Sequence, residues 1–250
     1  MTTTHTHRVA YITGGMGGIG TALCRRLCKE GHTVIAGCGP GSPRREKWIR
    51  DMTDEGYKVV ASEGNVSNWE STQRAFEIAR AEVGPIDILV NNAGITRDGT
   101  FKQMTSADWH AVIDTNLNSL FHVTKQVIEG MLERGWGRII NISSVNALKG
   151  QFGQTNYSAA KAGMHGFSKA LAQEVVKKGV TVNTVSPGYV LTDMVKAMKP
   201  EILNSIVEQI PMGRLARPEE VAGLVAYLAS EEAGYITGAN ISINGGLHMV

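Results

Sequence analysis

The residue pair best suited to acid–base chemistry in this sequence is a tyrosine and a lysine four positions apart. Tyr157 and Lys161 open a helical pattern that runs from Tyr157 to Lys178, so the spacing places both side chains on one helix face. A phenol near pKa 10 is a poor acid–base group at pH 7, and lowering its pKa by about three pH units requires roughly 4 kcal/mol. An ammonium group about 4 Å away supplies on the order of 4 kcal/mol at an effective dielectric constant of about 20, although desolvation of the phenolate opposes that gain.

Further polar residues follow the expected strands, where a site on a parallel sheet opens. Ser143 and Ser144 come directly after the expected strand Arg138–Ile142, and the run Asn-Asn-Ala-Gly at 91–94 follows Ile86–Val90. Asn116 lies in the next helical stretch. A tyrosine and a lysine at this spacing are common by chance, so the conjunction with these residues is what indicates a catalytic site.

A glycine-rich turn follows the first expected strand and opens a helix. Its residues are Thr13-Gly14-Gly15-Met16-Gly17-Gly18-Ile19-Gly20. Glycine permits positive φ and close backbone approach, and a helix N-terminus offers free N–H groups to a pyrophosphate. A bare tight turn would also use glycine, but the position between a strand and a helix favours dinucleotide binding.

The end of the second expected strand, Thr33–Gly37, favours NADP over NAD. It continues as Cys38-Gly39-Pro40, without the acidic residue that often bonds the ribose 2′-hydroxyl of NAD. Arg44 and Arg45 follow shortly, and a guanidinium can bind a 2′-phosphate. We expect Arg44 to be the ligand because it is nearer the strand end; the alternative leaves both arginines on a solvated helix face.

Short apolar runs alternate with longer amphipathic stretches, which is typical of a parallel sheet covered on both faces. We predict an α/β, Rossmann-type doubly wound parallel sheet of about seven strands, in a single domain over residues 1–250. The expected strands are Arg8–Thr13, Thr33–Gly37, Tyr57–Ala61, Ile86–Val90, Arg138–Ile142, Thr181–Val185 and Asn240–Ile243. The expected helices are Gly18–Glu30, Pro43–Glu55, Trp69–Glu82, Ser106–Asp114, Leu117–Arg134, Tyr157–Lys178 and Pro218–Ser230, with helical pieces between about 190 and 212.

Composition excludes several other classes. The net charge of +2 over 250 residues is too balanced to indicate nucleic-acid binding. The N-terminal MTTTHTHR lacks the apolar segment of a secretory signal, and no apolar run approaches the roughly 20 residues of a membrane span, so we expect a cytoplasmic protein. Three cysteines give no disulfide framework, and we expect no metal site. His110, His122, His165 and His248 read as packing or surface residues.

The ordered motifs TGGMGGIG, NNAG, Asn116, ISS, YSAAK and SPG resemble those of the short-chain dehydrogenase/reductase superfamily, from Arg8 to the C-terminus. Within it, GCGPGSPRREKW, NNAGITRD, KGQFGQTNYSAAKAG and the GGLHM ending resemble the bacterial acetoacetyl-CoA reductases, which make (R)-3-hydroxybutyryl-CoA for polyhydroxybutyrate synthesis. The resemblance implies NADPH-dependent reduction of acetoacetyl-CoA. The alternatives are a 3-oxoacyl-[acyl-carrier-protein] reductase of fatty acid synthesis and a non-catalytic NADP-sensing module.

The resemblance also implies catalytic roles. Tyr157 would be the general acid, and Lys161 would bind the nicotinamide ribose and lower the tyrosine pKa. Ser144, preferred to Ser143 for its distance from Tyr157, would hydrogen-bond the substrate carbonyl. Asn116 would hold a water that relays protons to Lys161. The family usually forms tetramers through the helices near Leu117–Arg134 and Tyr157–Lys178 and the C-terminal strand, so we expect a homotetramer.

The implied NADPH site draws on most of the loops that follow strands. Its expected residues are Gly14, Gly15, Met16, Gly17, Gly18, Ile19, Gly39, Arg44, Gly64, Asn65, Val66, Asn92, Ala93, Gly94, Ile95, Tyr157, Lys161, Pro187, Gly188, Val190 and Thr192. Many relatives carry Asp-Val where this chain has Asn65-Val66; the asparagine keeps a carbonyl acceptor for adenine but loses the charge.

The implied substrate site lies on the loops after the fourth, fifth and sixth strands. Besides Ser144 and Tyr157, its expected residues are Asp98, Gln151, Phe152, Gln154, Tyr189 and Lys199. The polar side chains suit a short 3-oxoacyl group, Phe152 could cap it, and Lys199 could meet a phosphate of CoA. For each loop residue the alternative is a merely solvated side chain.

Overall fold

The computed structural model describes residues 7–196 and 198–249, and in this part of the chain seven parallel strands form one sheet in the order β3-β2-β1-β4-β5-β6-β7. The strands are β1 Val9–Ile12, β2 Thr33–Cys38, β3 Val59–Glu63, β4 Ile88–Asn91, β5 Gly137–Ile142, β6 Val180–Pro187 and β7 Asn240–Ile243. The order is that of a Rossmann-type sheet with one added strand, which confirms the predicted fold class.

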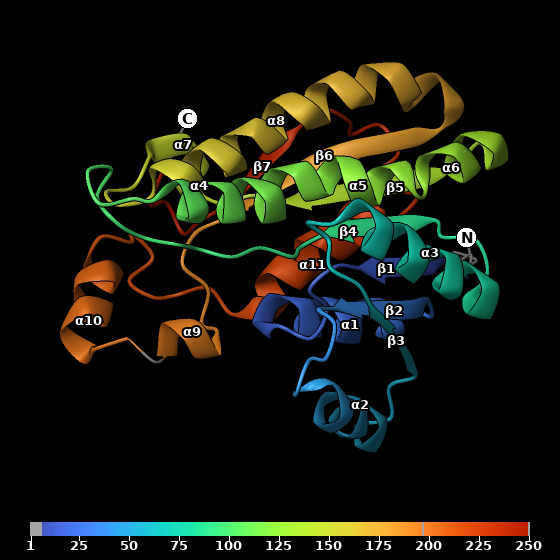
Figure 1. Ribbon diagram of the computed structural model, residues 1–250, viewed down its shortest axis with the longest axis horizontal. Coiled ribbons are helices and arrows are strands. Elements are labelled where there is room, and N and C mark those ends of the chain that lie inside the picture. Colours follow the sequence, from blue (N-terminus) through green and yellow to red (C-terminus); the bar gives the residue numbers. More distant parts are fainter. Residues whose placement is uncertain (1–6, 197, 250) are drawn as a thin grey trace.

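Helices cover both faces of the sheet (Figure 1). Helices α1, α2 and α11 lie on one face, and α3, α4, α5, α6 and α8 on the other (Figure 1). Their bounds are α1 Gly18–Lys29, α2 Arg45–Asp54, α3 Trp69–Val83, α4 Ser106–Ile113, α5 Ser119–Lys125, α6 Ile128–Arg134, α7 Asn146–Lys149, α8 Thr155–Val175, α9 Asp193–Lys196, α10 Pro200–Glu208 and α11 Pro218–Ala229.

Alternation along the strands divides the core into two clusters. In β1, Ala10 and Ile12 pack with α1 and α11, whereas Val9 and Tyr11 pack on the opposite face. Successive side chains of a strand point to opposite faces, so a sheet covered on both sides needs apolar residues at every position. The uninterrupted apolar runs seen in the sequence follow from this requirement.

The helix predicted over Leu117–Arg134 is interrupted in two places, at its start and near its middle. Asp114–Asn118 form a π-helical turn between α4 and α5, and a turn at Gln126 and Val127 separates α5 from α6. At this break Arg80 of α3 donates a 2.6 Å hydrogen bond to the carbonyl of Gln126. A partner from a distant helix therefore satisfies a carbonyl that a continuous helix would have used.

Several other boundaries differ from the predicted ones by about two residues. Helix α2 begins at Arg45 rather than Pro43, and β3 spans Val59–Glu63 rather than Tyr57–Ala61. Helix α8 begins at Thr155 and passes after Val175 into a short 3-10 turn. The short helix α7 was not predicted. Differences of this size at element ends are ordinary, because terminal turns lack part of their hydrogen bonds.

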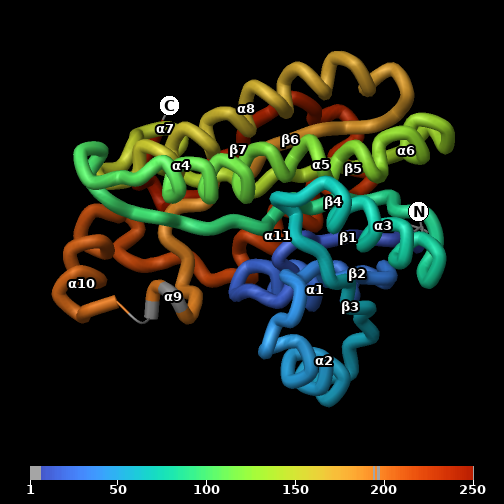
Figure 2. Tube along the Cα trace, viewed as in Figure 1, coloured from blue at the N-terminus to red at the C-terminus, as the bar shows by residue number. Residues whose placement is uncertain are grey.

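The carboxyl ends of the strands carry the irregular parts of the chain. Helices α9 and α10 and the green loop before α4 gather at this edge, and the last described residues lie near α7, whereas the start of β1 lies at the opposite edge (Figure 2). Strands β1 and β4 are neighbours at the centre of the sheet, where the strand order reverses. Ligands of such sheets bind at that reversal, outside the carboxyl ends.

Candidate functional site

The predicted catalytic side chains come from two neighbouring elements, the end of β5 and the first turns of α8. Ser144 is buried and forms a hydrogen bond with Tyr157. The Lys161 ammonium lies 5.7 Å from the centre of the Tyr157 ring and donates a 2.7 Å hydrogen bond to the carbonyl of Ile142. The three side chains predicted from spacing therefore converge on one site.

Burial governs the protonation of this group. It raises the pKa of Tyr157, with a smaller contribution from the Asp98 carboxylate, while the hydrogen bond from Ser144 acts in the lowering direction. Burial also lowers the pKa of Lys161 to about 7. Both shifts disfavour the charged forms, which is the effect of a site with little water around its ionisable groups.

The two neighbouring serines have different partners. Ser143 donates a 2.9 Å hydrogen bond to the main-chain carbonyl of Lys161 and contacts His165, so it ties β5 to α8. Ser144 accepts a 3.1 Å hydrogen bond from the main-chain N–H of Asn146, which leaves its own hydrogen for Tyr157 or a ligand. This geometry supports the choice of Ser144 over Ser143.

Asn116 is fully buried in the π-helical turn behind Lys161. Its amide nitrogen donates to the carbonyls of Ile95 and Val112, both at 2.9 Å, and its Oδ1 accepts from the Ile95 N–H at 3.1 Å. A Cβ added at Gly94 would strike Asn116 Oδ1 and lie 3.5 Å from Lys161 Nζ, so glycine keeps the space between them open. One lone pair of Oδ1 remains for a further donor.

The glycine-rich turn is built as a tight cradle. Gly14 has φ +61° and its Cβ position lies 3.0 Å from Ala93 Cα, while a Cβ at Gly20 would overlap the carbonyl oxygen of Gly14. Within the described residues no side chain caps the start of α1, so the N–H groups of its first turn remain available to an anion. These features fit the pyrophosphate of a dinucleotide.

The adenosine side of the predicted cofactor site coincides with a pocket of about 320 Å³. Eight predicted residues line it: Gly14, Gly39, Gly64, Asn65, Val66, Ala93, Gly94 and Ile95. Thr115, Tyr11 and Cys38 also line it and were not predicted; Thr115 adjoins Asn116, but nothing in its residue type marked it. The Asn65 Oδ1 accepts hydrogen bonds from the main-chain N–H and hydroxyl of Ser67, so this acceptor is already partly used within the loop.

Asn92 and Thr13 fix the loop after β4 against the glycine-rich turn. Thr13 Oγ1 accepts 3.0 Å hydrogen bonds from the main-chain N–H groups of Asn92 and Ala93. The Asn92 amide in turn donates to the carbonyls of Thr13 and Gly14 at 3.0 and 3.1 Å. The side chain of Asn92 therefore acts inside the protein, and its role toward a ribose stays a prediction.

Two adjacent arginines at the start of α2 differ in their partners. Arg45 pairs with Glu63 of β3 at 3.3 Å. Arg44 is exposed at the start of α2 and forms no ion pair within residues 7–196 and 198–249. The structure thus leaves the charge of Arg44, rather than that of Arg45, open to a phosphate, in line with the prediction.

The nicotinamide side is predicted on the segment after β6. A Cβ at Gly188 would lie 2.9 Å from Asn244 Cα, so this segment packs closely on the end of β7. Val190 is buried and bridges to Ala216. Thr192 sits against the first turn of α1, where a Cβ at Gly18 would lie 2.8 Å from its Cγ2. The segment therefore connects the glycine-rich turn with the carboxyl ends of β6 and β7.

Among the predicted substrate residues, Asp98 and Gln154 form a bridge between two loops. Gln154 donates a 3.0 Å hydrogen bond to Asp98 and accepts one of 2.9 Å from Asn146. Asn146 Oδ1 is buried and has no hydrogen-bond partner among the described residues. Burial is the main cause that raises the pKa of Tyr157 and of Tyr189, and the charge of Asp98 raises both further. The Asp98 carboxylate is therefore near both tyrosines.

The remaining substrate candidates lie further out. Phe152 is 86 % exposed, and Gln151 accepts a 2.8 Å hydrogen bond from Lys149. Lys199 is exposed and precedes α10. None of these three side chains forms a hydrogen bond with Ser144, Tyr157 or Lys161 among the described residues.

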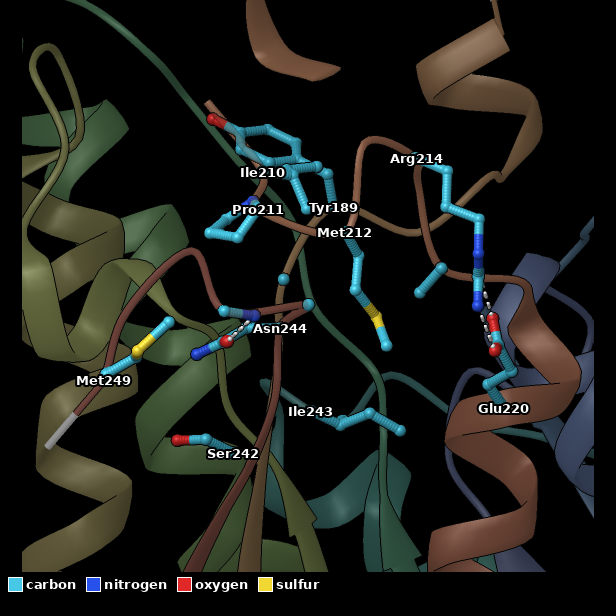
Figure 3. Close-up of a pocket in the computed structure, with 14 residues that line it drawn as sticks. Tyr189, Ile210, Pro211, Met212, Arg214, Glu220, Ser242, Ile243, Asn244 and Met249 are labelled. Atoms are coloured by element: carbon cyan, nitrogen blue, oxygen red, sulfur yellow. Dashed lines mark hydrogen bonds and ion pairs between the residues drawn. The ribbon is translucent and has the colours of Figure 1, made fainter. Parts of the chain in front are cut away.

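A cavity of about 580 Å³ adjoins this space, walled by Gly188 and Tyr189, the 210–216 loop and the C-terminal segment (Figure 3). Of the residues that line it, only Gly188 and Tyr189 were predicted to belong to a cofactor or substrate site. Met212 and Met249 provide apolar wall, and the paired Arg214 and Glu220 lie at one side (Figure 3). Irregular loops meet here, so no periodic pattern marked these residues.

Comparison with known proteins identifies the family. The sequence profile described as short chain dehydrogenase matches residues 8–202. The chain belongs to this family.

Within the described residues, no three His, Cys, Asp or Glu side chains are grouped to hold a metal ion. In the same part of this dehydrogenase, no helix has the length and apolar character needed to cross a membrane.

Individual relatives cover nearly all of this short chain dehydrogenase. It is 66 % identical over 244 residues to the acetoacetyl-CoA reductase of Cupriavidus necator, covering 98 % of this chain and 99 % of the relative. It is 58 % identical over 243 residues to the acetoacetyl-CoA reductase of Allochromatium vinosum, covering 97 % and 99 %. The 3-oxoacyl-[acyl-carrier-protein] reductase of Vibrio cholerae is 44 % identical over 243 residues, covering 97 % and 98 %.

Proposed function

We propose that this short chain dehydrogenase uses NADPH to reduce acetoacetyl-CoA, or a similarly short 3-oxoacyl-CoA, to the (R)-3-hydroxy thioester. The observation that carries the proposal is the convergence of Ser144, Tyr157 and Lys161 at the carboxyl end of the sheet. The choice of substrate is supported by the 66 % identity to a relative named acetoacetyl-CoA reductase, against 44 % to a relative named for carrier-protein thioesters.

The residues present fit a nicotinamide dinucleotide. The uncapped first turn of α1 would take the pyrophosphate, and the pocket formed by Gly64, Val66 and Ile95 would take the adenosine. Arg44 would take the 2′-phosphate that distinguishes NADPH from NADH, because its guanidinium is exposed and Arg45 is paired with Glu63. When bound, the cofactor supplies the hydride that reduces the substrate carbonyl.

Tyr157 would donate its phenolic proton to the substrate oxygen, and Ser144 would stabilise the same oxygen with its free hydroxyl hydrogen. The pKa of Tyr157 is raised by burial and not lowered as expected from Lys161, so the phenol is protonated before the reaction, and its release of the proton would depend on the hydrogen bond from Ser144 and on a charged Lys161. Lys161 would contact the nicotinamide ribose and return a proton to Tyr157 from a water held near Asn116. A pKa of about 7 allows Lys161 to both gain and release a proton near neutral pH.

The acyl pocket would be polar on one side and apolar on the other. Gln154 and Asp98 are held together by a 3.0 Å hydrogen bond, and the buried Asn146 Oδ1 remains able to accept one from a ligand. Phe152 would close over the acyl group, and Lys199 would meet a phosphate of CoA. These features favour a short, polar 3-oxoacyl group over a long alkyl chain.

The test is a cofactor-oxidation assay on wild type and Tyr157→Phe with acetoacetyl-CoA. We expect NADPH to be preferred over NADH and turnover to fall by about 10²- to 10⁴-fold in the variant, the usual value of a positioned acid. A higher rate with the acyl-carrier-protein thioester would assign the reaction to fatty acid synthesis. Binding of NADP without turnover of either thioester would instead indicate a sensing module.

We also propose a cytoplasmic homotetramer that serves polyhydroxybutyrate synthesis. Support comes from the exposed Phe121 on α5, which stacks on Trp69 at a centroid distance of 5.7 Å and would be covered by another subunit. Light scattering after size-exclusion chromatography should give four times the 26.9 kDa chain mass. A monomer would contradict the tetramer without affecting the proposed reaction.

A further inference from the structure

His165 is half-buried directly behind the catalytic trio, one helical turn after Lys161. Its Nε2 lies 3.0 Å from Ser143 Oγ, after β5, and 3.5 Å from Ser186 Oγ, near the end of β6. Ser143 precedes Ser144, and Ser186 precedes Pro187. One ring nitrogen therefore contacts the two strand ends that carry the expected carbonyl-binding serine and the start of the nicotinamide segment.

The surrounding hydrogen bonds determine which atom of His165 carries the proton. The single hydroxyl hydrogen of Ser143 goes to the Lys161 carbonyl at 2.9 Å, and that of Ser186 goes to Asn240 Oδ1 at 2.7 Å. Both serines can therefore only accept from the imidazole. The ring must carry a hydrogen on Nε2, and burial lowers the pKa of His165, which favours the neutral Nε2–H form at pH 7.

The same hydrogen bonds hold Lys161 at two points. The Lys161 ammonium donates to the carbonyl of Ile142, and the Lys161 carbonyl accepts from Ser143, which directly follows Ile142 in the chain. A short stretch at the end of β5 thus fixes both ends of Lys161 and carries Ser144. Ser143 is thus bonded to Lys161 through its side chain and joined to Ser144 through the backbone.

We propose that His165 is a positioning residue: its Nε2–H fixes Ser143 and thereby sets the relative positions of Ser144, Tyr157 and Lys161. This inference rests on the proposed reductase function, because that function provides its readout. His165 itself touches neither substrate nor cofactor in this proposal. The contact to Ser143 carries the effect, since at 3.0 Å it is shorter than the 3.5 Å contact to Ser186.

Three single variants and one double variant test the proposal with acetoacetyl-CoA and NADPH. His165→Leu removes the donor, His165→Gln offers an amide N–H at a similar reach, and Ser143→Ala removes the acceptor. We expect kcat to fall about five- to tenfold in His165→Leu, the value of one lost hydrogen bond, and at least as far in Ser143→Ala, which also loses the hydrogen bond to the Lys161 carbonyl, with little change in the KM for NADPH. His165→Gln should recover most of the loss.

The double variant His165→Leu/Ser143→Ala should be no slower than the slower single variant, because both substitutions break the same hydrogen bond. Multiplied losses in the double variant would overturn the proposal, as would equal rates of His165→Gln and His165→Leu. The matched cycle with Ser186→Ala should show weaker coupling to His165.

The pH profile separates positioning from partial unfolding. Displacement of Ser144 weakens the hydrogen bond that acts to lower the pKa of Tyr157. The apparent pKa for oxidation of the 3-hydroxy thioester should therefore rise in His165→Leu, whereas a partly unfolded enzyme would lose activity by the same factor at every pH. An unchanged apparent pKa would refute positioning. An inactive wild type would refute the proposed function, whereas an active wild type with an unimpaired His165→Leu variant would refute this inference alone.

Discussion

The burial of Lys161 predicts that this residue, which we propose to be catalytic, lowers the stability of the protein. Its pKa falls from 10.5 to about 7 because its ammonium is buried. A fall of this size corresponds to about 5 kcal/mol between the charged and neutral forms. Below pH 7 both the folded and unfolded states hold the proton, so the folded state bears the full cost. Between pH 7 and 10.5 only the unfolded state holds it, and stability rises by up to about 1.4 kcal/mol per pH unit.

Lys161→Met removes the charge and keeps an unbranched side chain of similar length. We expect the variant to lack this rise. The difference in free energy of unfolding, variant minus wild type, should therefore be largest near pH 6 and fall between pH 7 and pH 10. The lost hydrogen bond to Ile142 costs about 1 kcal/mol at every pH, which changes the offset and not the slope.

The measurement is urea unfolding of both proteins at several pH values between 6 and 10, with circular dichroism as the signal. Lys169→Met is the matched control, because Lys169 lies on the same helix with an exposed side chain, and its profile should parallel that of wild type. A stability difference between Lys161→Met and wild type that stays constant over this range would refute the argument. Turnover should be lost in Lys161→Met at every pH.

Four further substitutions have defined outcomes. Gly20→Ala should lower the melting temperature and the cofactor affinity, because the added Cβ meets the Gly14 carbonyl; the stability should fall by about 1–3 kcal/mol. Gly166→Ala in α8, where a Cβ meets nothing, should instead raise the stability by about 1 kcal/mol. Arg44→Ala should raise the KM for NADPH about tenfold or more and leave that for NADH unchanged; similar changes for both would exclude it from the 2′-phosphate. Asp98→Asn should lower the apparent pKa of Tyr157 in the pH–rate profile, since the carboxylate acts to raise it, and an upward shift would contradict this geometry.

The sheet was predictable because its strands are buried on both faces and need continuous apolar runs. The runs at Val9–Ile12 and Ile88–Asn91 became the central strands β1 and β4. The break between α5 and α6 was not predictable, since it depends on a hydrogen bond from Arg80, 46 residues earlier. Local patterns report a helix's own preference and not a partner that arrives from elsewhere in the fold.

The convergence of Ser144, Tyr157 and Lys161 was predictable for a similar reason, because their positions on one helix and at one strand end are visible in the chain. The proposed positioning role of His165 was not predictable from its residue type, although its half-buried position agrees with the expected packing residue. Its contacts are with Ser143, 22 positions before it, and with Ser186, 21 positions after it. The cavity walled by Met212 and Met249 was missed likewise, because it forms where three loops meet.

The two ends of the described chain lie at opposite edges of the sheet, and this has a practical consequence for immobilising the protein. A linker fused ahead of Arg8 would leave from the edge remote from Tyr157, so a surface-attached molecule would present its reactive side to the solution. A fusion after the C-terminus would extend from the segment in which Met249 lines the cavity beside Tyr189. Biosensor or flow-reactor formats should therefore couple the molecule through its N-terminal side.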